Sequence, residues 1–194
     1  MRSCRCLWLS LGFGLWVSGC VEDASAPADP DEEVGVATSA ITVADAIDTS
    51  CATSSVKGLS LQIIAKAACI EPDAYTEVPV LPNVTFVDTV FPFLEAPARD
   101  AFVAAAQKHA GTTMTVNSML RTVVQQYMLY RWYQDQLCGI GLAAKPGNSN
   151  HETGLALDVS EHGTWRAALE AEGFAWYGAG DPVQLTVDDS VAQL

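Results

Sequence analysis

The sequence predicts an α+β fold in which a small antiparallel sheet is flanked by helices. Segments with apolar residues every three to four positions mix with segments that alternate apolar and polar residues. They lack the regular strand–helix–strand order of a parallel sheet. The chain has 194 residues, with 49% hydrophobic and 17% charged, which is typical of one globular domain that follows an export segment.

The N-terminus has the pattern of a secretion signal. Arg2 and Arg5 precede an apolar run over residues 7–17, which is too short to cross a bilayer, since a spanning helix takes about 20 residues. The run ends in Val17-Ser18-Gly19-Cys20, which resembles a bacterial lipobox. The resemblance implies a signal peptide over residues 1–19 and acylation of Cys20. An ordinary secreted protein is the alternative.

The next segment, residues 20–50, is rich in Ala, Asp, Glu, Pro, Ser and Thr and has no aromatic residue. Such a composition predicts a disordered acidic tether between the lipid and a folded domain at 51–194. The chain carries 23 acidic and 10 basic residues, a net charge of −13. We therefore expect no nucleic-acid partner and contact with a membrane through the lipid anchor alone. The expected location is the cell envelope, on the periplasmic face of a bacterial membrane.

Four helices are expected within the domain, over residues 59–70, 97–111, 123–137 and 164–172, from their apolar spacing and their proline and glycine boundaries. Thr122 and Gln125 have the spacing of a capping box at the start of the third helix. Strands are expected over 78–90, where prolines interrupt the pattern, and over 113–119, 154–159 and 183–187.

Export would place Cys51, Cys69 and Cys138 in an oxidising compartment. Cys51 and Cys69 are the nearer pair in sequence, so we expect them to form a disulfide that ties the preceding segment onto the first helix. Cys138 would then be the unpaired cysteine. Two buried thiols are the alternative.

One segment is a candidate for a catalytic or metal-binding site. It reads Ser149-Asn150-His151-Glu152-Thr153-Gly154-Leu155-Ala156-Leu157-Asp158. In a strand, Gly154, Ala156 and Asp158 share one face, where small side chains leave space beside the carboxylate. An imidazole and a carboxylate are two of the three protein ligands that a catalytic zinc needs. A histidine in a turn and an aspartate at a strand end would give the same pattern without a metal.

This segment resembles the S-x-H-x-x-G-x-A-x-D signature of the D-Ala-D-Ala carboxypeptidase family of zinc peptidases. The similarity extends over roughly residues 114–187. It implies the fold shared by these peptidases and the hedgehog signalling domain, and peptidoglycan stem peptides as substrates. It also implies a zinc ion held by His151, Asp158 and a third ligand downstream, with Ser149 at the substrate site.

Two further stretches resemble the family. Arg121 and Gln126 match an arginine and a glutamine that contact substrate where a strand runs into a helix. Guanidinium can hold a carboxylate through two hydrogen bonds. Asp181 matches the acid that acts as general base in hydrolysis.

The sequence departs from the family at Gln184, where the third zinc ligand is expected to be histidine. A carboxamide is a weak zinc ligand, so the metal would be held less tightly or lost. His162 could substitute for it, whereas His109 is expected to end a helix. Two functions follow: zinc-dependent hydrolysis of stem peptides, or non-catalytic peptidoglycan binding by an envelope lipoprotein with a degenerate metal site.

Overall fold

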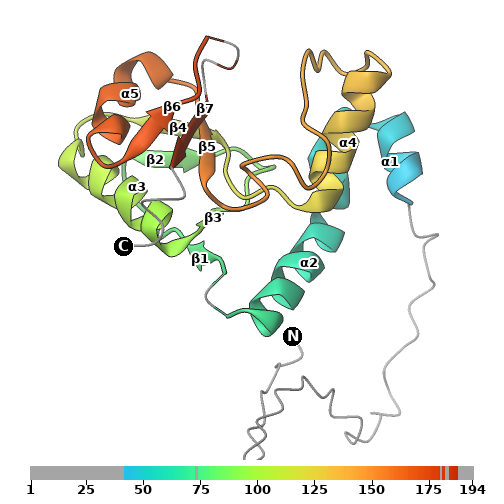
Figure 1. Ribbon diagram of the computed structural model, residues 1–194, viewed down its shortest axis with the longest axis horizontal. Helices are drawn as coiled ribbons and strands as arrows, with labels where there is room; N and C mark the ends of the chain where they lie inside the picture. Colours follow the sequence, from blue (N-terminus) through green and yellow to red (C-terminus); the bar gives the residue numbers. More distant parts are fainter. Residues whose placement is uncertain (1–41, 73, 180, 182–183, 188–194) are drawn as a thin grey trace, which may run out of the picture.

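The computed structural model describes residues 42–72, 74–179, 181 and 184–187. Its fold is α+β, as predicted. In Figure 1 a part built on a sheet lies beside a part built from helices, and the chain passes from one to the other several times. The signal peptide and Cys20, with most of the acidic segment, lie outside the described residues, so those expectations stay predictions.

The main sheet has five strands in the order β2-β4-β5-β7-β6. Neighbouring strands are antiparallel except β2 and β4, which are parallel, a pairing that the sequence did not predict. The strands are β2 (Val84–Phe86), β4 (Met114–Ser118), β5 (Ala156–Val159), β6 (Phe174–Trp176) and β7 (Gln184–Val187). A separate antiparallel pair is formed by β1 (Thr76–Glu77) and β3 (Phe93–Leu94).

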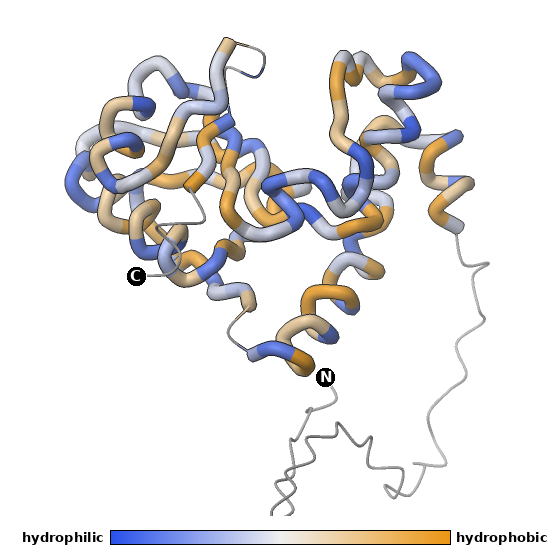
Figure 2. The backbone as a smooth tube through the Cα atoms, viewed as in Figure 1, coloured by the Kyte–Doolittle hydropathy of each residue, from blue (hydrophilic) through white to orange (hydrophobic). Residues whose placement is uncertain are grey.

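Helices α3 (Ala96–Lys108) and α5 (His162–Glu170) contact each other, and α5 also contacts β5, β6 and β7. The apolar face of β5, formed by Leu155, Leu157 and Val159, packs into this core as predicted. Orange segments run through the strands in Figure 2, where the backbone is coloured by hydropathy. The opposite side chain of β5, Asp158, is thereby held at a rigid sheet position.

The helical part contains α1 (Val43–Thr49), a 3₁₀ turn η1 (Thr53–Val56), α2 (Lys57–Ile70) and α4 (Val123–Gln134). The predicted capping box at the start of α4 is confirmed, since Thr122 and Gln125 satisfy each other's backbone N–H groups. Because Arg121 immediately precedes the N-cap residue Thr122, this cap fixes the position of that arginine at the start of α4.

The folded region begins earlier than predicted. Residues 43–49, assigned to the disordered tether, form α1, which a second capping box between Thr42 and Asp45 starts. Apolar contacts join α1 to α4, and the Trp132 indole N–H donates to the Ile47 carbonyl over 3.0 Å. Burial of Ala46 and Ile47 against α4 therefore orders a segment whose average composition suggested disorder.

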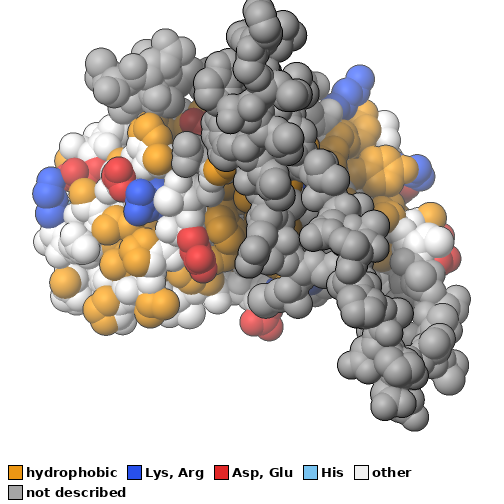
Figure 3. Space-filling view, turned by 90° about the horizontal axis from the view of Figure 1, so that it is seen from below, with side chains coloured by type: hydrophobic (Ala, Val, Ile, Leu, Met, Phe, Trp, Pro, Cys, Tyr) orange, Lys and Arg blue, Asp and Glu red, His pale blue; other side chains and the backbone are white. Residues whose placement is uncertain are grey.

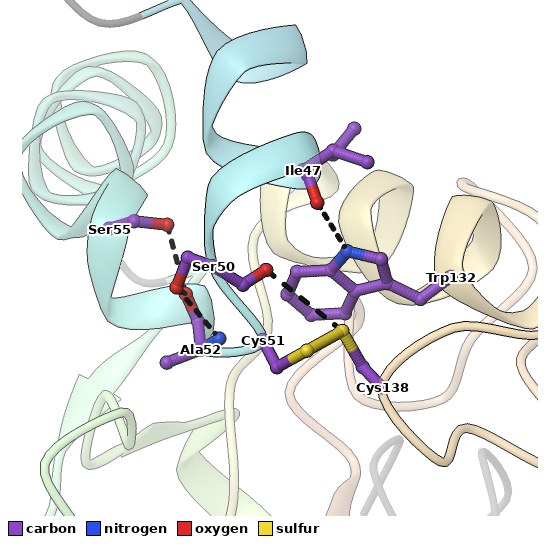
Figure 4. The surroundings of a disulfide bond; sticks show 7 residues. All are labelled: Ile47, Ser50, Cys51, Ala52, Ser55, Trp132 and Cys138. Atoms are coloured by element: carbon purple, nitrogen blue, oxygen red, sulfur yellow. Dashed lines mark hydrogen bonds between the residues drawn. A yellow bond between two sulfur atoms is a disulfide. The ribbon is translucent and has the colours of Figure 1, made fainter.

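The predicted Cys51–Cys69 disulfide is wrong. Cys51 is bonded to Cys138, with the two Cα atoms 5.2 Å apart (Figure 4). Cys69 lies in the last turn of α2, and the twelve residues from Lys57 carry it about 18 Å along the helix axis. A disulfide requires Cα atoms within about 7 Å, so the rigid helix takes the nearer cysteine in sequence out of reach.

Within the described residues, no helix combines the length and apolar character needed to cross a bilayer. On the coloured part of the surface in Figure 3, acidic and basic side chains are spread among apolar and polar ones.

Candidate metal and peptide site

Three polar residues form a row across the centre of the sheet. Asp158 on β5 pairs with Ser118 on β4 and with Gln184 on β7. Directly paired residues on neighbouring antiparallel strands point their side chains to the same face. Two of the three predicted ligand positions are therefore adjacent by sheet register alone.

His151 reaches the same point from the turn before β5. Its ring is buried, with an exposed fraction of 2%. Nδ1 lies 2.9 Å from the Met119 carbonyl oxygen and 3.3 Å from the Ser118 hydroxyl, and Nε2 lies 3.3 Å from Asp158 Oδ1. The predicted convergence of His151 and Asp158 is present in the structure.

The contacts of His151 decide which of its two ring nitrogens carries the lone pair. A carbonyl oxygen can only accept, so Nδ1 carries the hydrogen directed at Met119. In the neutral ring, Nε2 then carries the lone pair, and it lies 3.3 Å from Asp158 Oδ1, a buried oxygen without a hydrogen bond of its own. Two such atoms attract each other only through a shared cation or a second proton on the ring.

The spacing of these two atoms fits a zinc ion. Nitrogen and oxygen ligands about 2.0–2.1 Å from a tetrahedral zinc lie about 3.3 Å from each other, the same as the observed Nε2–Oδ1 separation of 3.3 Å. The backbone hydrogen bond on Nδ1 is also the usual support of a zinc-binding imidazole. His151 and Asp158 therefore fit two positions of a zinc site.

The third position is held by Gln184. Its exposed fraction is 8%, and it lines the same cleft as His151 and Asp158. Among the described residues no three His, Cys, Asp or Glu side chains cluster as a metal site, and neither His109 nor His162 lines the cleft. The ring of His109 instead meets Trp165 edge-on. A metal here depends on the amide oxygen of Gln184 or on water.

Arg121 lies on the other side of Asp158. One guanidinium nitrogen donates to Ser118 Oγ over 2.8 Å and contacts Asp158 Oδ2 at 3.3 Å, while the other donates to Gln126 Oε1 over 3.1 Å. The Gln126 amide in turn donates to the Ala144 carbonyl over 2.7 Å. Arg121 is thus oriented from three sides, and it still lines the cleft.

The charges of this group are strongly coupled. Burial alone would raise the pKa of Asp158, but the neighbouring His151 ring and the charge of Arg121 outweigh it and lower that pKa. Burial lowers the pKa of Arg121, and the carboxylates of Asp158 and Asp181 oppose this effect. Asp158 is therefore held as the anion that a metal ligand must be.

The turn that carries His151 is held by its neighbours. The Glu152 carboxylate accepts from the backbone N–H groups of Gly147 and Ser149, and the Tyr75 hydroxyl donates to the Glu152 carbonyl. Gly154 has a φ of +79°, and a Cβ there would lie 3.0 Å from the Glu95 backbone nitrogen. Glycine is required for this approach.

The prediction that Gly154 and Ala156 leave space beside Asp158 is wrong. Gly154 precedes β5 and packs against Glu95 and Tyr75, while Ala156 is fully buried within the sheet. Neither residue lines the cleft. Their small size serves close backbone packing, and the space in front of Asp158 comes from the loops around it.

A cleft of ≈ 530 Å³ opens in front of these residues. This volume lies within the range of about 300–1,000 Å³ that is usual for ligand sites. Its lining includes each predicted site residue: Arg121, Gln126, Ser149, His151, Asp158, Asp181 and Gln184.

Several residues at the site were not predicted from the sequence, among them Ser118, Leu142 and Tyr177. Ser118 joins Arg121 to His151, and its place three residues before Arg121 on a predicted strand was the available signal. Leu142 and Tyr177 line the cleft from two loops, with exposed fractions of 69% and 58%. Neither loop has a periodic pattern that would have marked them.

No curated protein sequence matches the chain. Among solved structures, the chain is similar to the LdcB LD-carboxypeptidase, whose structure is described as revealing the molecular basis of peptidoglycan recognition. The identity is 22% and the TM-score 0.44, over 59% of this chain and 70% of that one.

A family model, VanY, described as D-alanyl-D-alanine carboxypeptidase, matches residues 95–178. The match includes Arg121, His151 and Asp158, and it ends before Asp181 and Gln184. Residues 95–178 of the chain are therefore similar to the core domain of the D-alanyl-D-alanine carboxypeptidases that this model describes.

Proposed function

We propose that the protein hydrolyses the C-terminal region of peptidoglycan stem peptides with the help of a zinc ion held by His151, Asp158 and Gln184. The observation that carries the proposal is the pair formed by His151 Nε2 and Asp158 Oδ1, two buried atoms that lie 3.3 Å apart. The family match over this pair supplies the substrate class.

Each site residue has a role that its surroundings support. Arg121 is oriented by Ser118 and Gln126 and can hold a peptide carboxylate or a developing oxyanion. Ser149 and Gln126 line the cleft with hydrogen-bonding groups. Asp181 lies on the same cleft and would accept a proton from the attacking water and return it to the leaving amine. Zinc bound at this site would supply Lewis-acid polarisation and a more acidic water.

A second function is favoured by one observation, the amide of Gln184 opposite Asp158. With a neutral amide in place of a third strong ligand, a metal would be held weakly or lost, and His151 and Asp158 would lie beside each other without it. The cleft and Arg121 would then bind a stem peptide without cutting it. This is the non-catalytic peptidoglycan-binding alternative.

One experiment separates these functions. The purified protein is dialysed with Zn²⁺, and its metal content is measured before incubation with a synthetic stem peptide that ends in D-Ala-D-Ala. We expect zinc to be retained and D-Ala to be released, and we expect a chelator or His151→Ala to stop the release. His162→Ala is the matched control, since His162 does not line the cleft.

Peptide bound with a measurable Kd but left uncut, with zinc at background, would reject hydrolysis and support the binding function. No binding and no cleavage would reject both functions.

We also propose that the protein is exported and anchored through a lipid on Cys20. The Cys51–Cys138 disulfide supports export, because disulfides persist mainly in oxidising compartments. Cys20→Ser should move the protein from the membrane fraction to the soluble one. If it stays with the membranes, the lipid anchor is rejected.

A further inference from the structure

One wall of the cleft is formed by a segment without helix or strand. Residues 137–146, here called the wall loop, connect α4 to the turn that carries His151. The loop lines the cleft with Ile140, Leu142, Ala143 and Ala144. Such a coil has no ladder of backbone hydrogen bonds, so its position depends on individual attachments.

The first attachment is the Cys51–Cys138 disulfide. It joins the start of the wall loop to the junction between α1 and η1, 87 residues earlier in the chain. Figure 4 shows the sulfur atoms beside the Trp132 indole, whose N–H donates a hydrogen bond to the Ile47 carbonyl oxygen. Cys138 has a φ of +55°, a left-handed conformation that is uncommon outside glycine, so surrounding contacts must hold it.

Further attachments follow along the loop. Ile140 packs against the cluster that contains Met128 and Trp132. The Gln126 amide donates to the Ala144 carbonyl over 2.7 Å, and the backbone N–H of Gly147, just after the loop, donates to Glu152. The coil is thus attached at its start, in its middle and beyond its end.

Between these attachments the loop exposes an apolar side chain to the cleft. Leu142 is 69% exposed although it borders the polar centre around Arg121 and Asp158. A ligand site commonly combines such an apolar wall with a few placed polar groups. A peptide that sets a carboxylate on Arg121 can then lay an aliphatic side chain on Leu142.

We propose that the Cys51–Cys138 disulfide holds the wall loop as a preformed apolar surface, and that this surface positions an aliphatic part of the peptide substrate. Cys138 and Leu142 are then positioning residues that set substrate affinity and take no part in the chemical step. The inference rests on the proposed function, because it takes the cleft to be the peptide site. Binding is tighter when a surface is already ordered, since less conformational entropy is lost.

Leu142→Ala tests the surface. Because Leu142 is exposed, we expect unchanged thermal stability, an increase of about tenfold in KM for the stem peptide and an unchanged kcat, the pattern of lost uniform binding. If the peptide is bound uncut, Kd replaces KM. Val80→Ala is the control, since Val80 is 97% exposed and outside the cleft. An unchanged KM or Kd in Leu142→Ala overturns the proposal.

The double variant Cys51→Ser/Cys138→Ser tests the attachment, with Cys69→Ser as the control for loss of a thiol. Amide hydrogen exchange should become faster over residues 139–145 and stay unchanged in β5. If the wall then holds its binding conformation about a tenth of the time, KM or Kd rises about tenfold. A lower melting temperature with unchanged loop exchange and affinity would show a merely stabilising disulfide and overturn the proposal.

The two hypotheses fail in different ways. If the wild-type protein neither binds nor cuts the stem peptide, the proposed function fails and the substrate role of the wall loop fails with it, whatever the exchange data give. If the wild type binds or cuts the peptide while Leu142→Ala and the double variant match it, the proposed function stands and this inference fails.

Discussion

Replacing Gln184 with histidine is the substitution whose effect follows most directly from the geometry. Gln184 lies opposite Asp158 in the β5–β7 register, and both line the cleft with His151. Gln184→His would change the donor set from one imidazole, one carboxylate and one amide to two imidazoles and one carboxylate. Three strong protein ligands are the usual complement of a catalytic zinc. The two side chains are similar in size, so the buried position should accept the change.

The expected gain in zinc affinity is large. Removing a group that merely hydrogen-bonds to a zinc ligand typically costs roughly 10–100-fold in affinity. Adding a direct strong ligand should therefore lower the zinc Kd by at least that much, from about 10-fold to more than 100-fold. Hydrolysis at limiting zinc should rise in proportion to the fraction of protein that holds the metal.

Zinc affinity is measured by competition with a chromophoric chelator, and peptide hydrolysis by the release of D-Ala over a zinc titration. Thr186→His is the matched control. It adds an imidazole to the same strand, but its neighbour across β5 is Ala156, so it should leave zinc affinity unchanged. If Gln184→His binds zinc no more tightly than the wild type, position 184 does not belong to the metal site and the reasoning fails.

Three further substitutions test the remaining roles. Asp181→Asn should lower kcat by at least about 100-fold while zinc content stays the same, since a general base contributes 10²–10⁴; a change below about threefold would remove Asp181 from the mechanism. Arg121→Lys should raise KM by about tenfold or more, because an ammonium cannot reproduce the planar set of donors. The exposed Arg131→Lys is its control, and equal KM values would contradict the role of Arg121. Gly154→Ala should lower the free energy of unfolding by about 1–3 kcal/mol because of its positive φ, whereas Gly163→Ala in α5 should be neutral or stabilising; denaturant unfolding of both decides, and equal stabilities would refute the packing argument.

Local signals in the sequence predicted much of the fold. The capping box at Thr122 and Gln125 and the apolar alternation along β5 depend on neighbours in the chain, and both are present in the structure. Helix α1 had a comparable signal in Thr42 and Asp45, but the acidic composition around it suggested disorder. Composition averages over a segment, whereas a few buried contacts are enough to order a short helix within it.

Long-range features were less accessible. The pairing of Cys51 with Cys138 depends on how α1 packs against α4, and sequence separation carries no information about that contact. The parallel pairing of β2 with β4 likewise depends on the path of the chain through α3. The placement of His151, Asp158 and Gln184 could be expected from the family signature, and the sheet register gives its physical cause.

Leu142 and Tyr177 could not be assigned in this way, because loops without periodicity give no distinctive pattern. The only signal for Ser118 was its position on a predicted strand, three residues before Arg121.

The central claim is that His151 Nε2 and Asp158 Oδ1 are ligands of one metal ion. Anomalous diffraction at the zinc edge, from crystals of the wild-type protein grown with Zn²⁺, tests it most directly. The account predicts one peak between these two atoms, within about 2.0–2.2 Å of each. A direct His151–Asp158 hydrogen bond with no peak at that point, at saturating zinc, would contradict it.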